Sequence, residues 1–188
     1  MSAARHFRVA LRRIVTGDDA DGRSVVILDG PPASEAGAPD VGGLFEIWED
    51  TVSGPLDPRD RRDLGNARPV LGPRPGNLQV RWFVVAPEPE GVPRAAREAA
   101  ARAAFRTVDG ERHIIDQSRH PAMHETDTLD IVCLLSGEAS LILEAGETRL
   151  RPGQVVIQRA TNHAWVAHGG PALFLAVLVD RPVARPGR

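Results

Sequence analysis

Four polar residues at alternate positions of one predicted strand are the strongest candidates for chemistry in this chain. They are His124, Thr126, Thr128 and Asp130, and side chains two residues apart on an extended strand share one face. An imidazole, two hydroxyls and a carboxylate on one face do not fill an apolar core, because unpaired polar groups are costly to bury. The pattern therefore predicts a site on this face, or a solvated surface.

A second histidine, His163, stands at the start of a later apolar strand. Neutral imidazole is the commonest metal ligand in proteins. Two histidines and one carboxylate with open positions are typical of non-haem Fe(II) enzymes, and the same donors suit Mn, Ni or Zn. One interpretation is a single divalent metal ion (Fe, Mn, Ni or Zn) held by His124, Asp130 and His163. The alternatives are acid–base catalysis by the same three residues without a metal, or interior side chains satisfied by hydrogen bonds.

The residues beside this set are candidates for the walls of a substrate pocket. Thr126 is a poor metal ligand but can orient a substrate or hold a water molecule. Thr128 is expected to pack and hydrogen-bond inside its strand. Trp165 follows His163 by two residues, so it shares that face and forms either a pocket wall or ordinary core.

Four further residues are weaker candidates. Gln158 and Asn162 can bind a polar ligand group, although turn or surface positions are the default for them. Arg81 is the natural partner of a substrate carboxylate if it points inward. We expect it to point outward, because its apolar neighbours in the strand over 78–85 then fill the core. His120 lies in a turn and is a substitute third metal ligand only as the minority alternative.

These residues need strands to position them, and the sequence predicts mostly strands. Alternating and β-branched segments bounded by turn residues indicate a strand, whereas the Ala-rich segment after Pro93 favours a helix. Its small residues are expected to lie close on the sheet, with its arginines in solvent. The predicted elements are a hairpin over 6–30, a strand over 44–49, a Pro-rich loop over 53–76, a strand over 78–85, a helix over 94–105, and strands over 129–135, 139–143, 148–150, 154–158, 163–166 and 172–179.

The spacing of the candidate residues resembles the two motifs of the cupin superfamily, most closely its single-domain members. His124 matches the first histidine of the first motif, and six residues separate Asp130 from Gly137 as they separate the motif's glutamate from its glycine. His163 follows Gly153 by ten residues and matches the histidine of the second motif. The resemblance covers about residues 111–180 and implies an all-β jelly-roll barrel with an extended N-terminal sheet and one short helix.

Three positions depart from the cupin pattern. Thr126 replaces the second histidine, Asp130 replaces the glutamate and is one methylene shorter, and Ala167 stands where an asparagine is usual. These departures bear on metal binding and chemistry more than on fold. The expected organisation is a single domain over 1–188, with early strands, loop and helix over 1–110 packed on the barrel, core motifs over 111–180, and a flexible tail over 181–188.

Composition excludes several functions. The chain has 188 residues and a net charge of −2, so no charge excess indicates nucleic acid. All 23 basic residues are arginine, which excludes Schiff-base lysines and the lysine of a phosphate-binding loop. A single cysteine, Cys133, suits the reducing cytoplasm. The N-terminus lacks the apolar segment of a signal peptide, and no apolar run is long enough to span a membrane.

The favoured interpretation is a metal-dependent enzyme acting on a small organic acid, phenol or ketone, as a dioxygenase, decarboxylase, lyase or isomerase. The alternatives are the metal-free acid–base enzyme and a barrel that binds a small ligand without chemistry. Open barrel edges and the early strands favour a homodimer.

Overall fold

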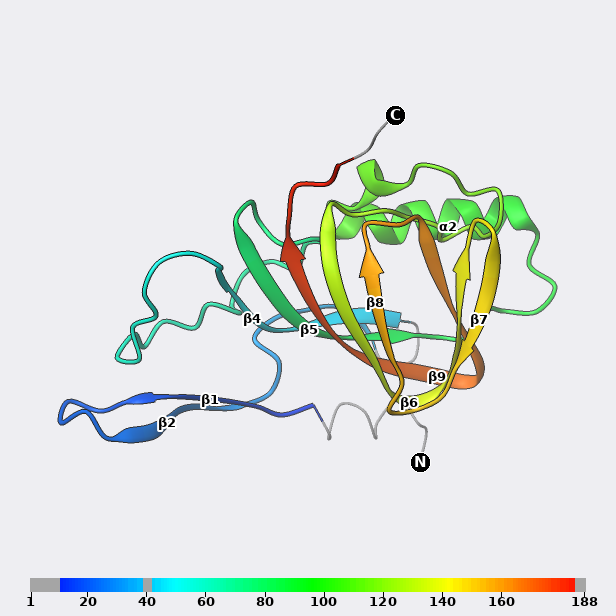
Figure 1. Ribbon diagram of the computed structural model, residues 1–188. Helices are drawn as coiled ribbons and strands as arrows, with labels where there is room; N and C mark the ends of the chain where they lie inside the picture. Colours follow the sequence, from blue (N-terminus) through cyan, green and yellow to red (C-terminus); the bar gives the residue numbers. More distant parts are fainter. Residues whose placement is uncertain (1–10, 39–41, 185–188) are drawn as a thin grey trace.

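The computed structural model describes residues 11–38 and 42–184. Strands β1 (Arg13–Asp18) and β2 (Ser24–Gly30) form an antiparallel hairpin that projects from the body of the molecule (Figure 1). The turn between them is closed by Asp19, whose carboxylate accepts hydrogen bonds from the backbone N–H groups of Asp21 and Arg23. The predicted hairpin is confirmed within the described residues. Its first residues, 6–10, and positions 185–188 of the predicted tail lie outside them.

The remaining strands form one antiparallel sheet. Its order is β3-β4-β5-β9-β6-β7, and β8 pairs with β6 as well. The members are β3 (Glu35–Ala38), β4 (Gly42–Thr51), β5 (Asn77–Val85), β6 (Thr128–Leu143), β7 (Gly146–Leu150), β8 (Val155–Arg159) and β9 (His163–Asp180). The predicted all-β fold is thereby confirmed. At the β3–β4 edge the prediction was wrong in two ways, because 35–38 form a strand inside a segment predicted as loop and β4 is longer than expected.

Strands β6 and β9 pair with each other along their whole lengths, from Thr128 opposite Asp180 to Leu143 opposite His163. The sequence predicted four short strands here, over 129–135, 139–143, 163–166 and 172–179. The structure instead has a β-bulge, because the register shifts on both sides of Ser136 and Gly137 adopts a φ of 84°. A bulge bends a strand without ending it. Each strand therefore runs from one half of the barrel into the other.

Two isolated bridges close the bent sheet on itself. The first half of β9 pairs with β6 along one edge. On its other edge it meets His124, in an antiparallel bridge to His163, and Pro87, in a parallel bridge to Ala167. Residues that are 39 positions apart in the sequence are thereby brought into direct contact. The bridge sets the position of both candidate histidines.

The main apolar core lies inside this closed sheet. Phe83 stacks on Phe174 with ring centroids 4.5 Å apart, and Trp165 packs at 5.0 Å from Phe174. The fully or nearly buried members are Val132, Leu134, Ala139, Leu141, Leu150, Ala167, Ala172, Phe174, Ala176 and Leu178. Most come from β6 and β9, so the same two strands that bend the sheet also supply the core.

The helix α2 (Arg94–Thr107) lies across one end of the barrel (Figure 1) and is followed by a short 3-10 helix, η1 (Glu111–His113). The predicted helix is confirmed, but its expected close packing on the sheet is wrong, because none of its residues is buried. Ala96 and Ala100 line an open cavity. Arg97, predicted to face solvent, turns toward the barrel and pairs with Glu88.

Among the described residues, no helix is long and apolar enough to cross a membrane.

The bulge at Gly137 is expected to be essential for stability. A Cβ atom there would lie 2.6 Å from the carbonyl oxygen of Pro171, and the left-handed φ disfavours any side chain. Gly137→Ala should lower the free energy of unfolding by about 2–4 kcal/mol in urea denaturation. Gly146→Ala is the matched control, since a Cβ there meets nothing within 4 Å, and should change it by less than about 0.5 kcal/mol. Equal effects would contradict the role of the bulge.

Candidate functional site

A cavity of about 540 Å³ opens into the barrel beneath α2. Its apolar walls come from the strands and from the alanine side of the helix, including Leu71, Phe83, Val85, Val132, Ala176 and Leu178. Its polar residues are Arg81, Glu88, Arg97, Thr107, His120, His124, Thr126, Asp130 and His163. A mostly apolar cavity with a few convergent polar groups is the usual form of a small-molecule site. Most of the candidate residues from the sequence lie in this cavity.

The two histidines lie against each other on the cavity wall. The backbone N–H of His124 donates to the carbonyl of His163 and the reverse bond is also made, both at 2.9 Å. Their ring centroids are 4.4 Å apart. The sequence prediction that these residues come together is therefore correct, and the cause is the bridge between their backbones.

The protonation of both imidazole rings is fixed by backbone carbonyls. Nδ1 of His124 lies 3.0 Å from the carbonyl oxygen of Ala122, and Nδ1 of His163 lies 2.9 Å from that of Thr161. A carbonyl only accepts, so each Nδ1 carries the proton and each Nε2 keeps its lone pair. Burial lowers the pKa of His124 to about 3 and that of His163 to about 4. Both rings are therefore neutral at neutral pH.

Asp130 is buried in the same cavity but apart from the histidines. Desolvation raises its pKa to about 6, although the hydroxyl of Thr128 and the charge of Arg81 oppose the shift. Its Oδ1 atom is buried without a hydrogen-bond partner. Within residues 11–38 and 42–184, no group of three or more His, Cys, Asp or Glu side chains could hold a metal ion. The predicted set of three ligands is thus not assembled in the structure.

The separation of Asp130 from the histidines follows from strand pairing. Asp130 pairs with Leu178 near the end of β9, whereas His163 is the first residue of that strand. The alternation from His124 to Asp130 was predicted correctly, since both residues line the cavity. The sequence did not indicate how far Asp130 lies from the histidines along the cavity wall, because that separation depends on where β9 bends.

The two threonines between them hydrogen-bond to each other. Their Oγ1 atoms are 2.7 Å apart, and both side chains are buried. Thr126 lines the cavity, as a residue that orients a substrate must. Thr128 packs and hydrogen-bonds within the strand, as expected, and lies outside the cavity lining.

Arg81 points inward, so the prediction that it faces solvent was wrong. It is 2% exposed and forms an ion pair with Glu46 at 3.1 Å, directly opposite it in the β4–β5 pairing. Its two terminal nitrogens also donate to the carbonyl oxygens of Leu71 and Val70, at 3.0 and 2.5 Å. Desolvation lowers the pKa of Arg81 and raises that of Glu46. The guanidinium is therefore largely engaged by the protein itself.

The remaining predicted wall residues divide into two groups. Trp165 lines the cavity with its ring centroid 5.8 Å from that of His163. Gln158 does not line the cavity, because its amide donates to the carbonyl oxygen of Thr161 at 3.2 Å. Asn162 donates to Glu144 and to the backbone of the preceding loop. Both amides are buried. Asn162 lies in the turn between β8 and β9, as the default allowed, whereas Gln158 lies within β8, so the default was wrong for Gln158.

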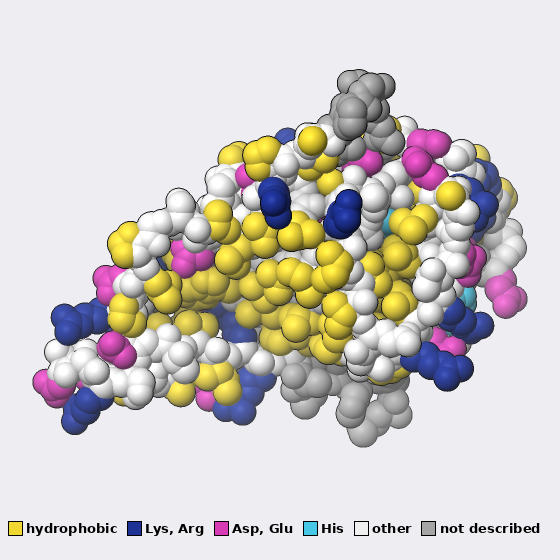
Figure 2. Space-filling view, viewed as in Figure 1, with side chains coloured by type: hydrophobic (Ala, Val, Ile, Leu, Met, Phe, Trp, Pro, Cys, Tyr) yellow, Lys and Arg dark blue, Asp and Glu magenta, His cyan; other side chains and the backbone are white. Residues whose placement is uncertain are grey.

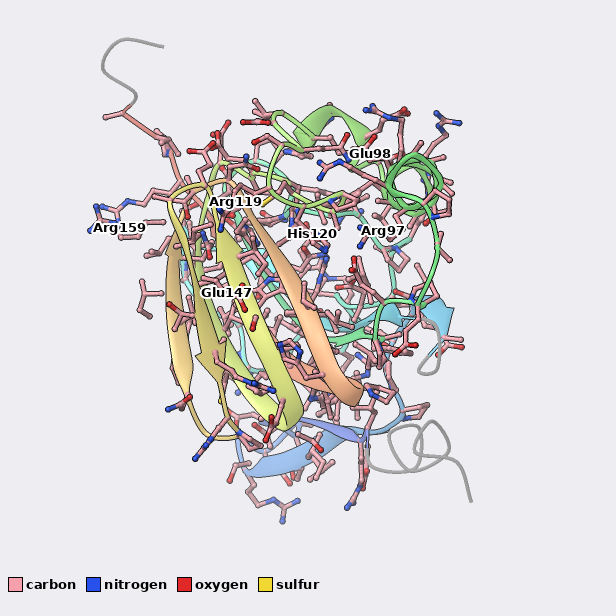
Figure 3. The ribbon with its side chains drawn as sticks, turned by 90° about the vertical axis from the view of Figure 1, so that its right-hand side faces the viewer. Arg97, Glu98, Arg119, His120, Glu147 and Arg159 are labelled. Atoms are coloured by element: carbon pink, nitrogen blue, oxygen red, sulfur yellow. The ribbon has the colours of Figure 1, made fainter. Side chains whose placement is uncertain are left out.

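His120 is not available as a third ligand. Its Nε2 lies 2.7 Å from a carboxylate oxygen of Glu88, and its Nδ1 accepts a hydrogen bond from the backbone N–H of Ala122. Arg97 of α2 binds the other oxygen of Glu88, so the carboxylate links the helix to the barrel (Figure 3). Sequence reasoning missed Glu88 and Arg97, which lie in segments with no recognisable motif.

The helix also contacts the histidine pair directly. Phe105 packs against His124 with ring centroids 4.8 Å apart, and both residues line the cavity. Any ligand beside the imidazoles therefore lies next to Phe105. The signal in the sequence was the single aromatic residue on an otherwise alanine-rich helix face.

Comparison with known proteins says more about the fold of the chain than about its chemistry. No model of a protein family matches the chain. Over 157 residues it is 30% identical to phomopsin biosynthesis cluster protein D of Diaporthe leptostromiformis, covering 81% of this chain and 68% of that protein. It is 40% identical over 63 residues to a cupin-domain-containing oxidoreductase of Hypocrea virens, covering 31% and 32%. A cupin superfamily protein of Desulfitobacterium hafniense, solved by crystallography, aligns at 16% identity with a TM-score of 0.34, covering 55% and 68%.

Because Asp130 is buried, we expect the free energy of unfolding to fall as the pH rises, and we expect Asp130→Asn to remove this fall. Its pKa is about 6 in the fold against 3.8 ordinarily, so the folded chain holds the proton more tightly and stability from this group falls as pH rises from about 4 to 6. The change amounts to about 3 kcal/mol. In urea denaturation across this range, Asp130→Asn should gain stability relative to the parent by up to that amount.

Asn66→Ala is the control, because this exposed side chain carries no titratable group. Its stability difference from the parent should stay constant with pH. A constant difference for Asp130→Asn as well would show that Asp130 is not desolvated in the fold.

Proposed function

The chain has a cupin fold, and we propose that it is a small-molecule enzyme whose reaction takes place in the cavity beside His124 and His163. The observation that carries the proposal is the fixed state of the two imidazoles. Both are neutral, both have the proton on Nδ1, and both line an apolar cavity with Nε2 unprotonated. Such rings are prepared either to bind a metal ion or to accept a hydrogen bond from a substrate.

The pair would hold one divalent metal ion such as Fe, Mn, Ni or Zn with only two protein ligands, because the described residues bring no third ligand to it. Metal-binding histidines usually donate their second ring N–H to a carbonyl or carboxylate, and both rings here donate to carbonyls. His124 and His163 would be the protein ligands through Nε2, leaving the other positions open to substrate and water. A bound ion would supply Lewis-acid polarisation of a substrate oxygen or a place for O2 chemistry.

The residues of the chain itself explain how a substrate is held. The apolar walls exclude water and suit the body of a small organic acid, phenol or ketone. Phe105 and Trp165 contact the histidine pair and would hold a ring or alkyl group beside it. The hydroxyl of Thr126 would orient a polar substituent. Several relatives are described as oxidoreductases, which favours oxidation among the reactions that cupins perform.

A second candidate is acid–base catalysis without a metal, and Asp130 is the observation that favours it. A carboxylate with a pKa of about 6 is near the value of an efficient general base at neutral pH. Its partnerless Oδ1 would accept a proton from a substrate that lies along the cavity. The neutral histidines would then serve as donors and acceptors at the other end.

Metal uptake separates the two candidates. We expect the parent protein, purified without a poly-His tag, to contain or take up about one Fe, Mn, Ni or Zn ion per chain in elemental mass spectrometry. A saturating ion should raise the free energy of unfolding by about 2.7 kcal/mol at a hundredfold excess over Kd. Both effects should be lost in His124→Ala and in His163→Ala.

The control is His168→Ala, since Nε2 of His168 lies 2.8 Å from the hydroxyl of Ser140, outside the cavity. It should retain full metal content. A parent that takes up none of the four metals would overturn the metal-dependent candidate and leave the acid–base one.

Location in the cytoplasm, inferred from the single cysteine, stays a prediction.

A further inference from the structure

Two buried polar residues of β5 and β6 lie in the part of the cavity away from the histidine pair. Arg81 and Asp130 both line the cavity, and they are 2% and 4% exposed. Arg81 pairs with Ala176 of β9, and Asp130 pairs with Leu178, two residues further along the same strand. Figure 2 shows hydrophobic side chains gathered over the outer side of these strands, where Ile131 is 38% exposed. These two polar side chains therefore belong to the cavity side of the sheet.

Each of the two side chains keeps one polar atom without a partner. Oδ1 of Asp130 and Nε of Arg81 are buried and have no hydrogen-bond partner. The terminal nitrogens of Arg81, by contrast, are engaged by the carbonyl oxygens of Leu71 and Val70 and by Glu46. Buried polar atoms are normally paired, because an unpaired one has lost its water without gaining a partner. A ligand that bonds to both atoms would remove this penalty.

The two unpartnered atoms need opposite kinds of partner. The Nε–H group of Arg81 can only donate a hydrogen bond, and the ionised Asp130 can only accept one. A hydroxyl group of a ligand can do both, since its hydrogen donates and its oxygen accepts. A ketone oxygen only accepts, so it would leave Asp130 without a partner. A carboxylate has the same defect and adds a second negative charge beside Asp130.

The charges around this part of the cavity also disfavour an anion. Glu46 forms its ion pair with Arg81 at 3.1 Å, and Glu49 forms one with Arg74. Among the described residues, Asp130 has no ion-pair partner, so its charge is not compensated. Desolvation raises the pKa of Asp130 to about 6, which leaves it largely ionised above pH 7. A negatively charged ligand group would therefore meet an uncompensated negative charge of low solvent exposure.

We propose that Asp130 and Arg81 form a subsite that accepts a neutral hydroxyl group of the substrate and rejects a carboxylate. The hydroxyl donates to Oδ1 of Asp130, and an oxygen of the same ligand accepts from Nε of Arg81. This inference rests on the proposed function, because the same cavity receives the substrate. It selects a phenol or an alcohol among the substrate classes and excludes an organic acid whose carboxylate enters this end. The apolar walls hold the rest of the molecule, with its other end beside His124 and His163.

The test compares three probes that share one ring system and differ in one group: naphthol, naphthyl methyl ketone and naphthoate, each substituted at the same position. Their dissociation constants are measured by NMR titration of the isotope-labelled full chain, without added metal and at about pH 7.5, where Asp130 is ionised. We expect naphthol to bind about 30-fold more tightly than naphthoate and about tenfold more tightly than the ketone. The amide signals of Asp130 and Leu178 should shift with naphthol, because these residues pair at the subsite.

Two variants separate the charge of Asp130 from its hydrogen bond. Asp130→Asn removes the charge and keeps a carbonyl acceptor, so naphthoate should bind about tenfold more tightly and naphthol should stay within about threefold of the parent. Asp130→Ala removes the acceptor and should weaken naphthol binding by about tenfold. The control is Asp21→Asn in the projecting hairpin, whose side chain is 73% exposed, and it should change none of the three constants. Circular dichroism of each variant confirms that the chain is folded.

The outcomes separate the subsite from the proposed function. Equal binding of naphthol and naphthoate, no binding of naphthol at about 1 mM, or a preference that both Asp130 variants leave unchanged would overturn the subsite. Because the titration needs neither metal nor turnover, it is independent of the metal-uptake experiment. A chain that shows the preference but takes up no metal would keep the subsite and lose the metal-dependent function. A chain that takes up metal without the preference would lose the subsite alone.

Discussion

The pairing of β6 with β9 over their full lengths is the constraint on which the rest of the structure depends. Both strands bend at the bulge around Gly137, and the bend brings the first half of β9 back to meet His124. The site is therefore a product of strand curvature, because a straight pair would leave its two histidines apart. The same curvature separates Asp130 from His163, since they occupy opposite halves of the bent ribbon.

The cavity wall carries polar groups that do little for stability. Arg81 on the wall and its partner Glu46, which lies outside the lining, are nearly fully buried, and burial shifts the pKa of each in the direction that favours the neutral form. A buried ion pair offsets its own desolvation only in part, and apolar residues of similar size often stabilise a fold as well or better. Asp130 is a net cost to folding at neutral pH. Polar groups retained at such a cost mark a working surface, and they support the assignment of this cavity as the site.

Alternation along the chain predicted one side of the barrel correctly and the other incorrectly, for one physical reason. From His124 to Asp130 the inner residues are polar, so their common face was recognisable. In β5 both faces are apolar: Phe83 and Val85 line the cavity, while Val80 and Trp82 face outward. A period of two then gives no indication of which face is inside. Arg81 was therefore predicted to face outward by default, although the structure pairs it with the buried Glu46 on β4.

Helix α2 leaves the cavity empty because the side chains that it presents to the cavity are small. Its cavity-facing positions Ala96, Ala100 and Ala104 carry only a methyl group, so α2 closes the barrel without filling it. Its contacts with the barrel are concentrated at Phe105 and at the link from Arg97 to Glu88. Helix propensity alone explains alanine at these positions, which is why the sequence did not reveal that α2 forms a wall of the cavity. With larger side chains the same helix would complete a core; with alanine it leaves an open cavity beside His124.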